Sequence, residues 1–274
     1  MKIAKAIIAA SLAAVFSFCT ASCSLESENI VENTISFDSI NQITASLSST
    51  DLRINLGNEN SVYYKVYESL EPDVSEKDGK LKIVSEKKKS ASLNFNTSTY
   101  IEVTLNKKQL DDIDLTLSSG DVQINDINVN GNIQTSSGNI KINNVENSNN
   151  ISLQASSGDI SLKKCSFKTL KNKTESGDIY LERINSNNII IEAKSGDTDI
   201  VDTDICNIEA NSHSGNVKIK LNGNENDINY DLSANSGSIK VGDSSYEDQY
   251  INNNNADKTI KCKTKSGNIT VRLS

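Results

Sequence analysis

A short turn sequence, Ser-Gly followed by Asp, Asn or Ser, recurs eight times in the second half of this 274-residue chain. Each copy precedes a stretch of alternating apolar and polar residues, the pattern of a β-strand with one buried face. Successive turn glycines lie 18, 20, 19, 19, 19, 22 and 30 residues apart. A period near 19 residues is typical of a solenoid, in which each repeat forms one coil that packs on its neighbours. The eight turn glycines are Gly120, Gly138, Gly158, Gly177, Gly196, Gly215, Gly237 and Gly267.

The residues two and four places after each glycine are expected to line the core, because alternation points them to the same face. They are aliphatic in every copy except at Thr198, so stacked coils would form two aliphatic ladders. A second alternating stretch, such as Ile189 to Ala193, lies in most repeats and predicts about two strands per coil. Each turn glycine is expected to have a positive φ, which other residues resist. The predicted fold is therefore a single elongated all-β solenoid, similar to a β-helix.

Residues 35–117 lack the Ser-Gly turns but keep the alternation, as in Leu52 to Leu56 and Ile101 to Leu105. We expect them to form a less regular N-terminal β region that is continuous with the solenoid and caps one end. Residues 118–274 supply the solenoid repeats. The final strand follows an insert of residues 242–258, and we expect it to expose an edge for self-association or for a partner's strand.

The first 22 residues are typical of a bacterial signal peptide. Two lysines precede an apolar run from Ala6 to Phe18, and small residues precede Cys23. Small residues directly before a cysteine also resemble a lipobox, which predicts that Cys23 carries a lipid and anchors the chain to a membrane. An ordinary cleaved signal is the alternative. The polar residues 23–34 are predicted to form a tether between anchor and domain.

Charge and cysteine content limit the partners of the chain. The net charge is −8 without a basic cluster, which argues against nucleic-acid binding. Cys165, Cys206 and Cys262 remain after the leader, an odd number that excludes a complete disulfide framework, and their alternation with polar residues predicts small core side chains. His213 is the only histidine, which argues against a zinc site. We predict neither a metal site nor a cofactor.

Two acidic features allow sharper hypotheses. Asp and Asn residues follow the turn glycines and would form a row along stacked coils, where a cation could bind between the carboxylates. The simpler interpretation is that these side chains form hydrogen bonds to their own local backbone. An acidic cluster with nearby lysines could form the active site of a polysaccharide-acting enzyme. The same residues are also explained as charged side chains on the outward faces of strands. The row is Asp121, Asn139, Asp159, Asp178, Asp197, Asn216 and Asn268, and the cluster is Asp197, Asp199, Asp202 and Asp204 with Lys218, Lys220 and Lys240.

The recurring Ser-Gly-Asp-Ile-x-Ile turns, the strand Tyr100 to Leu105 and the segment Leu115 to Val122 resemble the bacterial putative-adhesin β-solenoid family. The resemblance runs from about residue 35 to residue 274. It implies an exported, noncatalytic protein of the cell envelope that presents an extended surface to an extracellular or envelope protein or polysaccharide. It supplies no catalytic residues. A periplasmic or envelope scaffold or assembly module is the alternative, and a polysaccharide-acting enzyme is less favoured. The face of the membrane on which the domain lies stays open.

Overall fold

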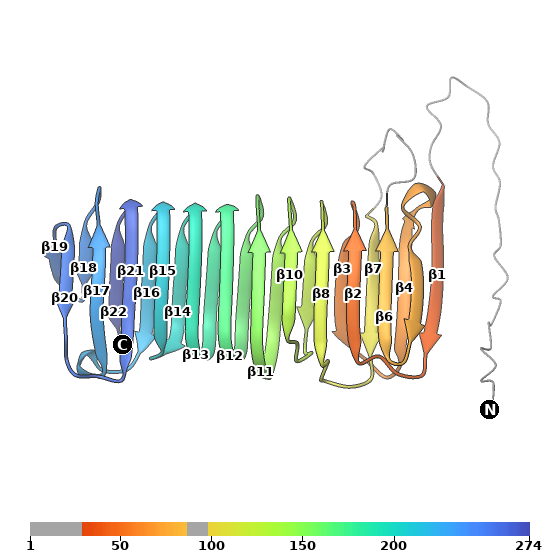
Figure 1. Ribbon diagram of the computed structural model, residues 1–274, viewed down its shortest axis with the longest axis horizontal. Helices are drawn as coiled ribbons and strands as arrows, with labels where there is room; N and C mark the ends of the chain where they lie inside the picture. The colour runs from red at the N-terminus through yellow and green to blue at the C-terminus, as the bar shows by residue number, and fades with distance from the viewer. Residues whose placement is uncertain (1–28, 87–97) are drawn as a thin grey trace, which may run out of the picture.

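The computed structural model describes residues 29–86 and 98–274, which form an elongated stack of β-strands (Figure 1). All of the strands belong to one hydrogen-bonded sheet, so the predicted all-β solenoid is confirmed. The predicted signal peptide and Cys23 lie outside the described residues. Two short 3-10 helices, η1 (Glu68–Leu70) and η2 (Glu225–Asp227), lie between strands, and no helix in the described ranges is long and apolar enough to cross a membrane.

The strands are β1 (Ile30–Phe37), β2 (Gln42–Leu47), β3 (Asp51–Leu56), β4 (Asn60–Tyr67), β5 (Asp73–Lys77), β6 (Lys80–Ser85), β7 (Tyr100–Leu105), β8 (Asp112–Leu117), β9 (Val122–Asn125), β10 (Gly131–Thr135), β11 (Ile140–Ala155), β12 (Ile160–Ser176), β13 (Ile179–Ser195), β14 (Thr198–Asp204), β15 (Asn207–Ser214), β16 (Val217–Asn222), β17 (Ile228–Ala234), β18 (Ile239–Val241), β19 (Ser244–Tyr246), β20 (Gln249–Asn252), β21 (Lys258–Ser266) and β22 (Ile269–Leu273).

The coils stack into two faces, each a ladder of parallel strands. Face A contains, in spatial order, β6, β2, β8, β10, the C-terminal parts of β11, β12 and β13, then β15, β21 and β17. Face B contains β7, β3, β9, the N-terminal parts of β11, β12 and β13, then β14, β16, β22 and β18. Face A lies toward the viewer in Figure 1. Each Ser-Gly turn carries the chain from face A to face B.

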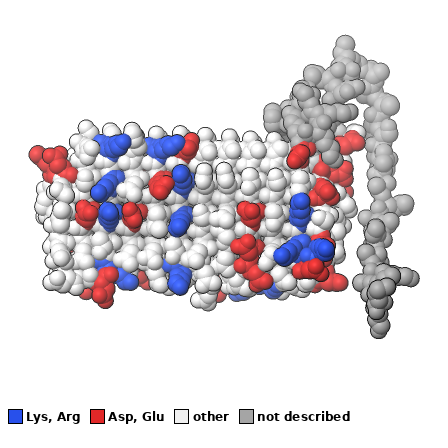
Figure 2. All heavy atoms as spheres, in the orientation of Figure 1, with Lys and Arg blue, Asp and Glu red and all other residues white. Residues whose placement is uncertain are grey.

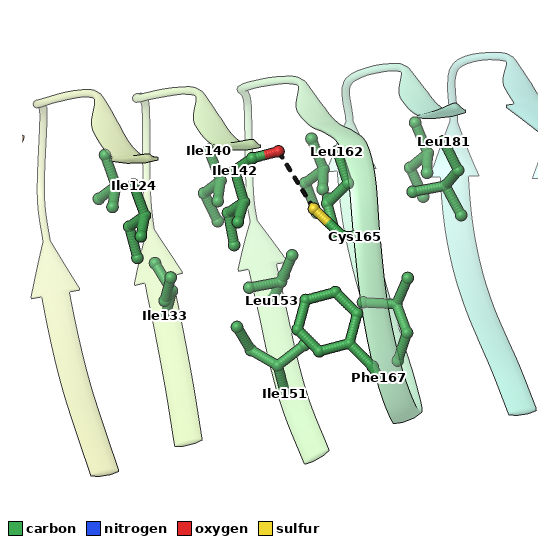
Figure 3. Close-up of a cluster of buried hydrophobic side chains, with 14 of the residues drawn as sticks. Ile124, Ile133, Ile140, Ile142, Ile151, Leu153, Leu162, Cys165, Phe167 and Leu181 are labelled. Atoms are coloured by element: carbon green, nitrogen blue, oxygen red, sulfur yellow. Dashed lines mark hydrogen bonds between the residues drawn. The ribbon is translucent and has the colours of Figure 1, made fainter. Parts of the chain in front are cut away.

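The two predicted aliphatic ladders run along the inner side of face B. Ile142, for example, pairs with Ile124 on one side and with Leu162 on the other, and the same register continues through the remaining coils. All three side chains are fully buried. Aliphatic side chains from face A, such as Ile133 and Leu153, fill the space between the faces (Figure 3). The result is one continuous apolar core along the stack.

Five successive coils bend at a non-glycine residue that lies six places after the turn glycine. These residues have φ values of 50° to 60°, in the left-handed region that Asn and Asp tolerate better than most residues. The bend lets β11, β12 and β13 continue around the corner toward face A. The five residues are Asp126, Asn144, Lys164, Arg183 and Asp202.

At both ends the spatial order of the coils differs from their order in the chain. Strands β2 and β3 lie between β6 and β7 on one side and β8 and β9 on the other. Strands β21 and β22 likewise lie between β15 and β16 on one side and β17 and β18 on the other. The final strand is therefore paired along both edges, and the prediction that it exposes an edge is wrong. The insert of residues 242–258 is the reason, because it lets the chain pass the last coil and return inside it.

Antiparallel strands cover the two ends of the stack. β19 and β20 pair with β18 and β17 at one end, whereas β4 pairs with β7, β1 with β4 and β5 with β6 at the other. Residues 35–117 thus cap the stack only in part, because β2, β3 and β8 are coil strands. The predicted tether is also too long: β1 begins at Ile30, and Val31 and Ile35 pack against the core. Asn33 occupies the inner face between these two side chains, and this polar residue interrupts the apolar alternation.

The three described cysteines are unpaired core residues, as predicted. Burial raises the pKa of Cys165 to about 11 and the pKa values of Cys206 and Cys262 to about 12. The thiols therefore stay protonated at neutral pH, a state in which they react poorly. The thiol of Cys165 donates a long hydrogen bond of 3.6 Å to the carbonyl oxygen of Ile142 (Figure 3).

Candidate binding surface

The eight turn glycines stack directly on one another. A Cβ on any of them would lie closer than 3.0 Å to a carbonyl oxygen of the neighbouring coil, which belongs to Thr50 for Gly120 and to another turn glycine in the other seven cases. Among the eight turn glycines, positive φ values occur at Gly196, Gly215, Gly237 and Gly267. The prediction of a positive φ is therefore wrong for the other four. Close backbone contact between coils is the requirement that all eight share.

The residues that follow these glycines form a ladder of hydrogen bonds, which we call the Asx ladder. In each coil the side-chain oxygen accepts the backbone N–H of the equivalent residue in the next coil, at 2.7 to 3.1 Å. The ladder begins at Asp51, which sequence patterns missed because it follows no Ser-Gly turn. Its members, in spatial order, are Asp51, Asp121, Asn139, Asp159, Asp178, Asp197, Asn216, Asn268 and Ser238.

The Asx ladder gives the stacked carboxylates a structural role. One oxygen of each ladder carboxylate accepts an N–H of the next coil, so the bonds join neighbouring coils and do not close local turns. Across residues 29–86 and 98–274, no group of three or more His, Cys, Asp or Glu is arranged to hold a metal ion. Hydrogen bonds between neighbouring coils therefore explain the acidic row.

Replacing Asp178 with alanine is expected to lower the free energy of unfolding by about 1–2 kcal/mol, because the N–H of Asp197 loses its charged acceptor at 2.8 Å. Asp178→Asn is the matched control. It keeps the accepting oxygen, as Asn139 does at the equivalent place, and should cost about 0.5 kcal/mol or less. Urea unfolding followed by circular dichroism measures both. Equal losses in the two variants would show that the charge, and not the hydrogen bond, stabilises the ladder.

Two adjoining grooves lie along the corner where the coils enter face A. Their volumes are about 630 Å³ and about 420 Å³, and Thr169 lines both. The first is lined by Asp111, Asp112, Asn130, Gly131, Asn132, Asn149, Asn150, Ile151, Ser152, Thr169 and Lys171. The second is lined by Thr169, Asn188, Ile189, Ile190, Asn207, Ile208, Glu209, Thr259 and Lys261. Together they follow the stack across several coils.

A row of amide and hydroxyl side chains runs along both grooves, and we call it the polar row. Its members, Asn150, Thr169, Asn188, Asn207 and Thr259, occupy equivalent places in neighbouring coils. The Nδ2 of Asn207 donates to Oδ1 of Asn188 at 3.3 Å, and the N–H of Thr259 donates to Oδ1 of Asn207 at 3.1 Å. Neighbouring strands lie about 4.8 Å apart. The polar row therefore presents donors and acceptors at regular intervals, which suits a ligand with repeated hydroxyl groups.

Charged side chains border the grooves. Loss of hydration raises the pKa of Asp112 at the far end of the first groove, and the negative charge of Asp114 adds to the shift. Lys171 lies in the first groove and Lys261 in the second. Each groove thus carries charges of both signs, Asp111, Asp112 and Lys171 in the first and Glu209 and Lys261 in the second, among neutral polar groups.

The acidic cluster that allowed an enzyme hypothesis is engaged in structural contacts. Asp199 lies 3.7 Å from the amino group of Lys218, and Asp202 lies 3.5 Å from that of Lys220. Asp197 belongs to the Asx ladder. These pairs lie on face B, away from the two grooves. The cluster and the grooves are therefore separate features.

Parallel coils in register, a glycine stack and an Asx ladder define the chain as a β-solenoid protein with an extended polar surface. The family model Toastrack DUF4097 matches residues 40–272. The chain therefore belongs to the Toastrack DUF4097 family, and the family resemblance drawn from its Ser-Gly turns is confirmed. Comparison with curated proteins finds no match.

Solved structures share the fold at low sequence identity. A putative adhesin from Bacteroides fragilis is 17% identical, with a TM-score of 0.57 over 90% of this chain and 98% of that one. A putative adhesin from Parabacteroides distasonis is 14% identical, with a TM-score of 0.51 over 90% of this chain and 98% of that one. At these identities the likeness shows the solenoid fold.

Proposed function

We propose that this protein is a noncatalytic, adhesin-type protein of the bacterial cell envelope and that its two grooves bind a polysaccharide. The polar row carries the proposal, because its amides and hydroxyls repeat with the coil spacing while a linear polymer repeats its hydroxyl groups along the same direction. Many weak contacts along such a row add to a useful affinity. The names of the two structural neighbours favour an adhesive role as well.

The envelope location rests on the leader of the chain. Residues 1–22 have the composition of a bacterial signal peptide, and Cys23 follows small residues as a lipidated cysteine does. A lipid on Cys23 would hold the solenoid at a membrane surface. Face A is the surface that we propose meets a polymer of the cell surface or the surrounding matrix.

An assembly role is the weaker alternative for this fold. End-to-end association through β-strands needs long unpaired edges, and natural proteins blunt such edges with short or charged strands. At the C-terminal end the outermost strands, β19 and β20, have three and four residues. At the N-terminal end β5 carries charges at Asp73, Glu76 and Lys77, whereas the eight-residue strand β1 pairs with β4 along one edge alone among the described strands. The edges of β5, β19 and β20 are thus poorly suited to strand addition, and an assembly role would depend on the free edge of β1.

The test measures binding of fluorescent neutral polysaccharides to cells that express the tagged full-length chain. Thr169→Arg places a long charged side chain in both grooves and should weaken binding about tenfold. Ser161→Arg puts the same residue on the same strand, but on face B, and should leave binding unchanged. Cys23→Ala should abolish incorporation of a radioactive fatty acid into the protein.

Intact and permeabilised cells are compared in the same experiment. Binding to intact cells would place face A outside, and binding only after permeabilisation would place it in the periplasm. Equal binding by the Thr169→Arg and Ser161→Arg variants would contradict the groove, and no binding in either preparation would contradict the polysaccharide. Equal incorporation of the fatty acid by the unchanged protein and by the Cys23→Ala variant would contradict lipidation at Cys23.

A further inference from the structure

We propose that a second surface on face A binds acidic polysaccharides through their carboxylate or sulfate groups. The surface consists of Lys194, His213, Lys263 and Lys265, and we call it the cationic patch. All four side chains are exposed. Figure 2 shows basic side chains over the C-terminal half of face A, whereas the strip over β10 and the C-terminal part of β11 carries none. The patch lies apart from the polar row, so this inference goes beyond the proposed function.

The register of three strands brings the patch together. β15 pairs with β21 so that His213 lies opposite Lys265, and β13 pairs with β15 so that Lys194 lies opposite His213. Neighbouring strands are about 4.8 Å apart, so these side chains are close neighbours across the face. The amino group of Lys194 also lies 2.6 Å from Glu175, at the edge of the patch. The sole histidine of the chain thus lies between two lysines.

The two lysines of β21 lack compensating charges. Lys263 lies between Asn211 and Ser233, both neutral, in the adjacent strands. Within the described ranges, neither Lys263 nor Lys265 forms an ion pair. Lys263 and Lys265 alternate along the outer side of β21, so their charges lie on one face with no carboxylate directly opposite them in the adjacent strands. A cluster of this kind in a chain of net charge −8 therefore needs an explanation, and an anionic ligand supplies one.

On face B the alternate lysines of β16 lie beside carboxylates. Lys218 and Lys220 alternate along β16 just as Lys263 and Lys265 alternate along β21. Lys218 lies 3.7 Å from an aspartate and Lys220 lies 3.5 Å from another. The two pairs of lysines thus differ in their neighbours and not in their strand position, which makes the face B pair a matched control.

The surroundings of the patch favour a single narrow chain as the ligand. Lys261 precedes Lys263 by two residues on the same side of β21. It lies between Glu209 and Asp231 in the adjacent strands. These carboxylates border the patch, so a nucleic-acid duplex or a flat anionic membrane that covered the face would meet them. A polysaccharide chain is narrow enough to contact the lysines alone. The Asn211 amide and the Ser233 hydroxyl beside Lys263 can hydrogen-bond its sugar hydroxyls.

The experiment measures the affinity of the purified mature protein for heparin, which is sulfated, and alginate, which is carboxylated, with neutral dextran as the control polymer. The double variant Lys263→Gln/Lys265→Gln should raise the Kd about tenfold or more. Lys218→Gln/Lys220→Gln, with the same change in net charge, should alter it about twofold or less. High salt should weaken binding by the unchanged protein, because the contacts are exposed ion pairs. Heparin and alginate used separately distinguish the sulfate from the carboxylate.

Three results would overturn this inference: no affinity of the unchanged protein for either acidic polymer, equal losses in the two double variants, or tighter binding to duplex DNA or anionic phospholipid vesicles than to the polysaccharides. The groove variant Thr169→Arg should not weaken binding of the acidic polymers. The two sets of variants therefore distinguish a failure of the groove proposal from a failure of the cationic-patch proposal.

Discussion

Replacing Gly158 with alanine is expected to lower the free energy of unfolding by about 3 kcal/mol or more, because the added methyl group has no space. A Cβ at this position would lie closer than 3.0 Å to both the carbonyl oxygen and the carbonyl carbon of Gly138. Backbone atoms cannot rotate away as a flexible side chain can. The two coils must therefore separate, which weakens their ladder, including the 2.8 Å hydrogen bond from the N–H of Ser157 to the carbonyl oxygen of Ser136.

Gly158 is one of the four turn glycines without a positive φ. Its replacement therefore tests steric contact between coils without adding backbone strain. Ser157→Ala in the same turn is the control and should change stability by about 0.5 kcal/mol or less, because Ser157 bonds to the next coil through its backbone. Urea unfolding of both variants gives the comparison. A loss below about 1 kcal/mol for Gly158→Ala would show that the coils adjust to a methyl group and that the glycine stack is not a steric requirement.

The coil and its two ladders were predictable because they depend on local pattern. Residues such as Ile142 lie at a fixed distance from a turn glycine, and alternation within the strand decides which side they face. A constant period then brings equivalent residues into register. Thr198 interrupts the aliphatic sequence without breaking the ladder, and it is buried like its neighbours.

The order of the coils at the two ends was not predictable, because it depends on pairing between distant segments. Ile260 pairs with Ile208 on one side and Tyr230 on the other. An alternating strand has the same pattern whether it ends a stack or lies inside it, so the sequence of β21 does not distinguish the two places. Leu52 at the other end shows the same ambiguity, since it pairs with strands that come later in the chain.

The binding surface was only partly accessible from sequence. Asparagine-rich corners indicate turns, but the polar row also includes Thr169, and the groove depends on how far each strand extends around its corner. The cationic patch depends on the insertion of β21 beside β15, which places Lys265 next to His213. A stack in chain order would have put β17 there. Surface features that span neighbouring coils thus depend on the spatial order of the coils, and this order could be determined only from the structure.

Replacing Asn172 with leucine is expected to raise the free energy of unfolding by about 2 kcal/mol. Asn172 is 2% exposed and points into the core, where its register neighbours are Leu153 and Ile191. Neither polar atom of its side chain has a hydrogen-bond partner among the described residues. A buried amide without partners loses its hydration without compensation, whereas leucine would continue an aliphatic ladder whose neighbouring positions already hold branched side chains.

A gain of this size should raise the midpoint of thermal unfolding by roughly 4–8 °C for a domain of this length. Lys173→Leu is the matched control, since the adjacent residue of β12 is exposed on the outer side of face A and its replacement adds an aliphatic group that is not buried. It should leave the midpoint within about 2 °C. A fall in the midpoint for Asn172→Leu would mean that the amide makes favourable contacts inside the solenoid. A rise in both variants would attribute the gain to strand propensity and not to the removal of a buried polar group.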